Sequence, residues 1–161
     1  MNIYKNFLLK KEFDRLKDII MSVNFPWYFN EYVNHENEKG NNFQFTYLFC
    51  DRGKKNCIEQ HFQLIEPVLK KVNFKKLIRI KANLLTKTSK IIEYGYHTDV
   101  REKGTTGILY LDNSNGYTKF KNGKKIKSEE NKFVEFNSTL KHTGSSCTDQ
   151  KRRVVINFNY Q

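Results

Sequence analysis

Tyr-Gly-Tyr-His-Thr-Asp, residues 94 to 99, is the stretch around which this chain of 161 residues is organised. We expect a strand over 91–99, on which side chains two residues apart point to the same face. His97 and Asp99 would then place an imidazole beside a carboxylate. Taken alone, such a His-x-Asp pair is more typical of ordinary surface polarity than of a functional site.

A distant histidine gives this pair its significance. His142 follows after several short segments of strand character, behind Phe133-Val-Glu-Phe and before a Thr-Gly-Ser-Ser turn. We therefore expect it at a strand end that faces a cavity. Two histidines and one carboxylate on one side of a metal suit non-haem Fe(II) with open coordination positions.

The last strand supplies a cation for the same cavity. In Arg153-Val-Val-Ile-Asn-Phe-Asn-Tyr160, alternation puts Arg153, Val155, Asn157 and Asn159 on one face and the apolar residues on the other. A desolvated guanidinium requires an anion, and its planar fork matches a carboxylate. A dicarboxylic acid bound at the metal would supply that carboxylate. The alternative is that Arg153 belongs to a basic loop with its two neighbours.

Composition limits the classes of protein to which the chain can belong. Its length predicts a single domain over 1–161. Lys and Arg number 29 against 17 Asp and Glu, a net charge of +12 that attracts anions but is dispersed along the chain, which disfavours a nucleic-acid arm. Three cysteines, no secretory signal and no apolar run of membrane-spanning length lead us to expect a cytoplasmic protein without membrane association.

The pattern of apolar residues predicts helices first and strands afterwards. Helices are expected over 9–23 and 56–72, the second kinked or shortened by Pro67, and a polar hairpin loop over 34–42. This α+β arrangement favours a double-sheet jelly roll with the N-terminal helices packed on the major sheet. Strands are expected over 27–32, 43–50, 77–85, 91–99, 105–111, 117–121, 124–127, 132–136 and 153–160.

These residues, in this order, resemble the Fe(II)- and 2-oxoglutarate-dependent dioxygenases, and within them the prolyl 4-hydroxylase branch. The resemblance covers about 77–160, and its signature is His-x-Asp, a distal histidine and a later basic residue. The segment Ile108-Leu-Tyr-Leu-Asp-Asn113 is similar to the family's Tyr-Leu-Asn segment. Gly116-Tyr-Thr-Lys-Phe120 stands where the family has Gly-Gly-x-Thr-x-Phe.

The resemblance implies a double-stranded β-helix in which His97, Asp99 and His142 hold Fe(II). 2-Oxoglutarate would chelate this iron as cosubstrate, with its far carboxylate paired to Arg153.

Three further residues take roles from the same resemblance. Tyr110 matches a tyrosine that hydrogen-bonds the far carboxylate. Asn83 stands where a second such tyrosine is usual, which is a departure from the family's pattern. Asn157 shares a face with Arg153 and is a candidate for contact with the cosubstrate or with a water near the iron.

The activity implied is hydroxylation of a C–H bond with O2, which converts 2-oxoglutarate to succinate and CO2. The expected substrate is a peptidyl proline or another protein residue, over which the segment 32–42 would fold. One alternative is a nucleobase-oxidising dioxygenase, which would need a base-flipping wedge and a stacking pocket. Another is a non-catalytic jelly-roll binding module with a vestigial His-x-Asp pair.

Overall fold

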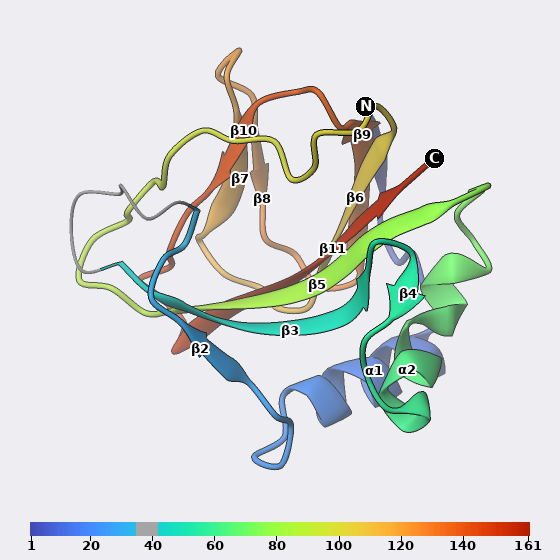
Figure 1. Ribbon diagram of the computed structural model, residues 1–161. Coiled ribbons are helices and arrows are strands. Elements are labelled where there is room, and N and C mark those ends of the chain that lie inside the picture. Colours follow the sequence, from blue (N-terminus) through green and yellow to red (C-terminus); the bar gives the residue numbers. More distant parts are fainter. Residues whose placement is uncertain (35–41) are drawn as a thin grey trace.

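The computed structural model describes residues 1–34 and 42–161 and contains two helices and a large, mostly antiparallel sheet system (Figure 1). The predicted loop over 34–42 lies outside the described residues except at its two ends. The helices are α1 (Lys10–Ile20) and α2 (Glu59–Leu69). The strands are β1 (Asn2–Tyr4), β2 (Tyr28–Asn30), β3 (Gln44–Asp51), β4 (Lys54–Lys55), β5 (Leu77–Thr86), β6 (Thr105–Tyr110), β7 (Tyr117–Phe120), β8 (Lys125–Lys127), β9 (Lys132–Asn137), β10 (His142–Gly144) and β11 (Arg152–Tyr160).

The strands form two sheets, as a jelly-roll-like fold requires. The larger sheet has the order β1-β9-β6-β11-β5-β3-β2, with β4 paired to β3, and the smaller has the order β10-β7-β8. All of the strand pairs in both sheets are antiparallel. Figure 1 shows β7, β8 and β10 on one side of the curved strands β3, β5 and β11, and both helices on the other side.

Strand β11 separates the apolar core from the cavity between the sheets. Its residues Val154, Ile156, Phe158 and Tyr160 belong to a hydrophobic cluster that also contains the buried residues of both helices. Its other face carries Arg153, Val155 and Asn157 toward the cavity. This confirms the alternation predicted for the strand. The helices contribute through residues at helical spacing, which are Phe13, Leu16 and Ile20 of α1 and Leu64, Ile65 and Val68 of α2.

The structure corrects three expectations. The segment 91–99 is not a strand, because it meets the free edge of 142–145 only at two isolated bridges, Glu93 with Ser145 and His97 with His142. Helix α2 is shorter than predicted, since it begins at Glu59 and ends at Leu69, with Pro67 in its last turn. The short strands β1, β4 and β10 were not predicted, because segments of two or three residues carry no readable periodicity.

No helix among residues 1–34 and 42–161 is long and apolar enough to span a membrane.

The stability of the larger sheet should depend on its buried leucines. Leu109 of β6 is fully buried in the main hydrophobic cluster, whereas Leu140 is 44% exposed. We expect Leu109→Ala to lower the free energy of unfolding by about 2–5 kcal/mol, because it removes packed methyl groups and leaves a cavity. Leu140→Ala should change it by less than about 0.5 kcal/mol. Urea unfolding measures both, and equal losses would contradict this placement of the core.

Candidate active site

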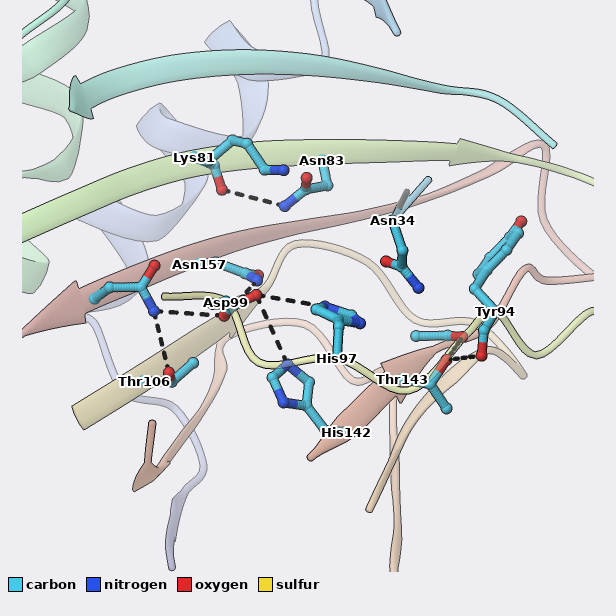
Figure 2. A network of polar contacts seen from close by, with 12 residues as sticks. Asn34, Lys81, Asn83, Tyr94, His97, Asp99, Thr106, His142, Thr143 and Asn157 are labelled. Atoms are coloured by element: carbon cyan, nitrogen blue, oxygen red, sulfur yellow. Dashed lines mark hydrogen bonds and ion pairs between the residues drawn. The ribbon is translucent and has the colours of Figure 1, made fainter. Parts of the chain in front are cut away.

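Three potential metal ligands from distant parts of the chain meet at one point in the cavity. One ligand atom from each of His97, Asp99 and His142 lies within 4.8 Å of the others. His97 Nε2 is 3.5 Å and His142 Nε2 is 3.8 Å from the same carboxylate oxygen, Asp99 Oδ1 (Figure 2). The sequence predicted this convergence.

Backbone pairing brings the two histidines together. His97 N–H donates to the carbonyl of His142 over 2.9 Å, and His142 N–H donates back over 3.0 Å. The two residues therefore lie opposite each other in an antiparallel bridge, and their ring centroids are 4.8 Å apart. The prediction that a regular strand would align His97 with Asp99 was wrong; the bridge to β10 places His97 instead.

A backbone carbonyl faces Nδ1 of each imidazole. His97 Nδ1 is 3.1 Å from the carbonyl oxygen of Gly95, and His142 Nδ1 is 3.1 Å from that of Leu140. In the neutral imidazole this geometry places the proton on Nδ1, so the lone pair of Nε2 points toward Asp99. Such hydrogen bonds orient histidines for metal binding.

Two asparagines of β11 hold the Asp99 carboxylate. Asn157 Nδ2 donates to Asp99 Oδ2 over 3.0 Å, and Asn159 Nδ2 approaches the same oxygen at 3.4 Å while donating to Thr106 Oγ1 over 3.1 Å. Asn157 Oδ1 is buried and has no hydrogen-bond partner among the described residues. The carboxylate is thus fixed by Oδ2 and presents Oδ1 to the histidines.

The charges around Asp99 keep it ionised in spite of its burial. Its side chain is only 4% exposed, and burial alone would raise its pKa. The pKa of Asp99 is nevertheless held well below its usual range, by His97 and His142 when their imidazoles are protonated on Nε2 and by the Arg79 guanidinium throughout. Burial lowers the pKa of His142, so this imidazole is neutral at pH 7.

The three donors fit a divalent metal ion. Two Nε2 lone pairs and an ionised carboxylate oxygen face one another at 3.5 and 3.8 Å, which is too far for hydrogen bonds. Electron-rich atoms placed in this way repel one another unless a cation lies between them. Imidazole nitrogens with one carboxylate form the facial set typical of non-haem Fe(II).

Arg153 is buried in the same cavity without a carboxylate partner. It is 2% exposed, and no Asp or Glu among the described residues forms an ion pair with it. Its Nε donates to Ser128 Oγ over 2.7 Å, Nη2 to Thr118 Oγ1 over 3.3 Å and Nη1 to the Ser145 carbonyl over 3.5 Å. A guanidinium has five N–H donors, so one remains on each terminal nitrogen. This pair of free donors fits a carboxylate bound by both oxygens.

The chain is similar to known proteins in its fold but not in its sequence. No protein family model matches the sequence, and no curated protein matches it either. A prolyl-4-hydroxylase from Pseudomonas putida is 12% identical with a TM-score of 0.63, over 99% of this chain and 91% of the other. A prolyl hydroxylase from Trichoplax adhaerens, solved with a hypoxia inducible factor peptide, is 11% identical with a TM-score of 0.66, over 99% and 82%. The fold is that of the prolyl hydroxylases.

Two further structures with this fold broaden the comparison. The viral collagen prolyl hydroxylase of Paramecium Bursaria Chlorella virus-1 is 14% identical with a TM-score of 0.59, over 98% of this chain and 87% of the other. A 2OG-Fe(II) oxygenase family member from Burkholderia pseudomallei is 12% identical with a TM-score of 0.63, over 94% and 78%. The likeness covers nearly the whole chain, including the N-terminal half, where the sequence resemblance was loose.

Within the prolyl hydroxylase fold, Tyr110 lies behind the cavity wall. It is fully buried, and its hydroxyl donates to Thr118 Oγ1 over 2.8 Å. Thr118, rather than Tyr110, lines the cavity and also accepts from Arg153. Direct contact between Tyr110 and a cosubstrate stays a prediction. What the structure shows is that the Tyr110 hydroxyl holds Thr118, the residue that accepts a hydrogen bond from Arg153.

Asn83 and Asn157 both line the cavity, as their predicted roles require. Asn83 lies on β5 opposite Val155 of β11, and its Nδ2 donates to the Lys81 carbonyl over 3.3 Å. Figure 2 shows Asn83 on β5, with Asn157 lying nearer Asp99. Asn83 therefore belongs to the β5 side of the cavity wall, and its contact with a cosubstrate stays a prediction.

Several residues of the site were not predicted. Asn159 was placed on the correct face of β11 but received no role, although alternation with Asn157 was a usable signal. Arg79, whose Nη2 lies 3.7 Å from Asp99 Oδ1, shares a strand face with Asn83 and could have been found in the same way. Ser128 lies 25 residues before Arg153 and Ser145 directly follows β10, and no sequence pattern links either of them to Arg153, so only the fold reveals their contacts.

Metal binding tests the donor set directly. We expect the protein to bind one Mn(II) ion, and Asp99→Asn to weaken that binding by at least about 100-fold because it removes the charged ligand. The matched control, Asp18→Asn on the exposed face of α1, should leave the affinity within about twofold. Binding should weaken as the pH falls through the histidine range, because protons compete for the same nitrogens. Isothermal titration calorimetry measures this, and unchanged affinity in Asp99→Asn would contradict the assignment.

Proposed function

We propose that the protein is an Fe(II)- and 2-oxoglutarate-dependent dioxygenase that hydroxylates a residue of a protein or peptide. The observation that carries this proposal is the pairing of two features in one cavity. His97, Asp99 and His142 offer three metal-binding atoms at one end, and Arg153 lies buried without a carboxylate partner at the other. A metal and a dicarboxylic cosubstrate would complement both.

In this proposal each residue has a defined task. His97, Asp99 and His142 hold the ion, and Asn157 holds the carboxylate in place. Arg153 binds the far carboxylate of 2-oxoglutarate through the two N–H groups that its protein partners leave free. When bound, Fe(II) and 2-oxoglutarate would activate O2, the oxidant: one oxygen atom would enter the C–H bond as a hydroxyl group, and the other would enter succinate as 2-oxoglutarate is oxidised with loss of CO2.

Peptide substrates are supported by what the similar structures are. One is named a collagen prolyl hydroxylase, and another was solved with a hypoxia inducible factor peptide. We therefore propose a peptidyl proline or another protein side chain as the position oxidised. Cys50, Cys57 and Cys147 are all unpaired, which is compatible with the reducing cytoplasm that we propose as the compartment.

Succinate release tests the proposed reaction. We expect Fe(II)-dependent formation of succinate from 2-oxoglutarate, stimulated by proline-containing peptides more than by oligonucleotides. His97→Ala should abolish it, because the metal loses one of its three ligands. The control, His61→Ala, alters a histidine whose Nδ1 contacts Tyr47 outside the cavity and should retain the activity. Absence of Fe(II)-dependent succinate formation in the unaltered protein would reject the proposal, and preferential stimulation by oligonucleotides would favour a nucleobase substrate.

Gly116 should be required for cosubstrate binding. A Cβ added at this position would lie 2.5 Å from Arg153 Cδ and 2.8 Å from the Ser146 carbonyl oxygen, so the arginine would have to move. We expect Gly116→Ala to weaken 2-oxoglutarate binding about tenfold, a loss of about 1.4 kcal/mol. Mn(II) affinity should stay within about twofold, since the metal ligands lie elsewhere.

Gly123→Ala is the control for a general loss of stability. Gly123 has a φ of +89° in a turn where an added Cβ meets nothing within 4 Å. Its replacement should strain the backbone without affecting the affinity for 2-oxoglutarate. Calorimetric titration with 2-oxoglutarate compares the unaltered protein with Gly116→Ala and Gly123→Ala. Equal affinities for 2-oxoglutarate in all three would contradict the role given to Arg153.

A further inference from the structure

Lys81 is a cation of the cavity wall that the proposed reaction does not use. It lies on β5, on the strand face that also carries Asn83 and Leu85 into the cavity (Figure 2). The sheet register places Lys81 opposite Asn157, the residue that donates to Asp99. Lys81 is therefore at the metal end of the cavity.

Arg153 lies at the opposite end of the same pair of strands. It is opposite Leu85, four residues along β5 from Lys81, which corresponds to about 13 Å at the usual strand rise. The two cations are therefore attached at different ends of the cavity wall. A carboxylate held by both N–H groups of Arg153 leaves Lys81 without a partner.

Within the described residues the counter-charge that acts on Lys81 is the Asp99 carboxylate, which lies beyond ion-pair distance. No carboxylate among the described residues forms an ion pair with it. The carboxylate at this end of the cavity, Asp99, is occupied by the two histidines, Arg79 and Asn157. Burial, followed by the repulsion of Arg79, lowers the pKa of Lys81 to about 8 against the opposing attraction of Asp99, so much of it is still charged at neutral pH. An ammonium group removed from water without a partner is costly.

The loaded site would keep this excess of positive charge. Fe(II) is balanced by the Asp99 carboxylate and by the chelating end of 2-oxoglutarate, and Arg153 is balanced by the far end. Asp99 is shared between Fe(II) and Arg79, so the positive charges of both Arg79 and Lys81 are incompletely balanced, and of these two cations Lys81 is the one that lines the cavity. The remaining space next to the metal is where a substrate has to enter.

We propose, on the basis of the function proposed above, that Lys81 is a specificity-determining residue that binds a carboxylate of the substrate. The preferred substrate is then an acidic peptide with a carboxylate close to the residue that is oxidised. That carboxylate comes either from an Asp or Glu side chain or from the C-terminus of the peptide.

Peptide binding tests this assignment without turnover. The full chain, loaded with Fe(II) and 2-oxoglutarate under anaerobic conditions, is titrated into fluorescein-labelled heptapeptide pools with a central proline. One pool contains a single Glu and a matched pool contains Gln at the same place, each with a free or an amidated C-terminus. We expect the protein to bind the Glu pool about tenfold more tightly than the Gln pool, or to bind free termini more tightly by the same factor.

Two substitutions assign this preference to the lysine. Lys81→Met should reduce the preference to less than about twofold, and Lys81→Glu should reverse it in favour of a pool with Lys in place of Glu. The matched control, Lys87→Met, removes the same charge from an exposed position just beyond β5 and should keep the full preference. Unchanged Mn(II) and 2-oxoglutarate affinities show that the variants are folded.

The outcomes separate this inference from the function on which it rests. A preference for acidic peptides that persists in Lys81→Met would overturn the assignment. The assignment would also be overturned if a protein that forms succinate bound the acidic and neutral pools equally, or bound neither pool. If no succinate is formed with any peptide, the proposed function fails whatever the binding preference is.

Discussion

The site depends on one buried carboxylate, Asp99. An ionised carboxylate that is 4% exposed survives only where hydrogen bonds and positive charge compensate for lost water. Asn157 and Asn159 supply the hydrogen bonds, and Arg79 supplies a charge at 3.7 Å. In their neutral form the two histidines present Nε2 lone pairs, and no N–H groups, to the Asp99 carboxylate. The arrangement is therefore most stable when a cation lies among the three donors.

Strand β11 connects that carboxylate to the stability of the whole chain. It is paired on both edges, with β5 and with β6, and so lies in the middle of the larger sheet. One of its faces packs into the core shared with the helices, and the other carries Arg153, Asn157 and Asn159. The apolar packing that holds β11 in place therefore also fixes the distance between Arg153 at one end of the cavity and the metal ligands at the other. Strand β11 therefore supports both the fold and the candidate site.

The sequence predicted the residues of the site better than the backbone that positions them. The three donors were identifiable from the His-x-Asp spacing and the distal histidine, and Arg153 because a buried guanidinium is costly unless it meets an anion. Alternation along β11 was also predictable, since the polar residues Arg153, Asn157 and Asn159 all fall on one face of a regular strand. The segment that carries His97 and Asp99 was wrongly expected to be a strand. It pairs with 142–145 at two isolated bridges only, and the sequence of a segment does not show how much of it will find a pairing partner. The partners of Arg153 were beyond prediction, since Ser128, Ser145 and Thr118 meet it only through the fold.

The measurement that tests the central claim most directly is a crystal structure of the protein grown with Mn(II) and 2-oxoglutarate, with the ion located by anomalous scattering. We predict a single anomalous peak surrounded by His97, Asp99 and His142, and the far carboxylate of 2-oxoglutarate on the guanidinium of Arg153. An ion bound elsewhere, or a carboxylate held by a different cation while Arg153 stays unpaired, would contradict this account of the site.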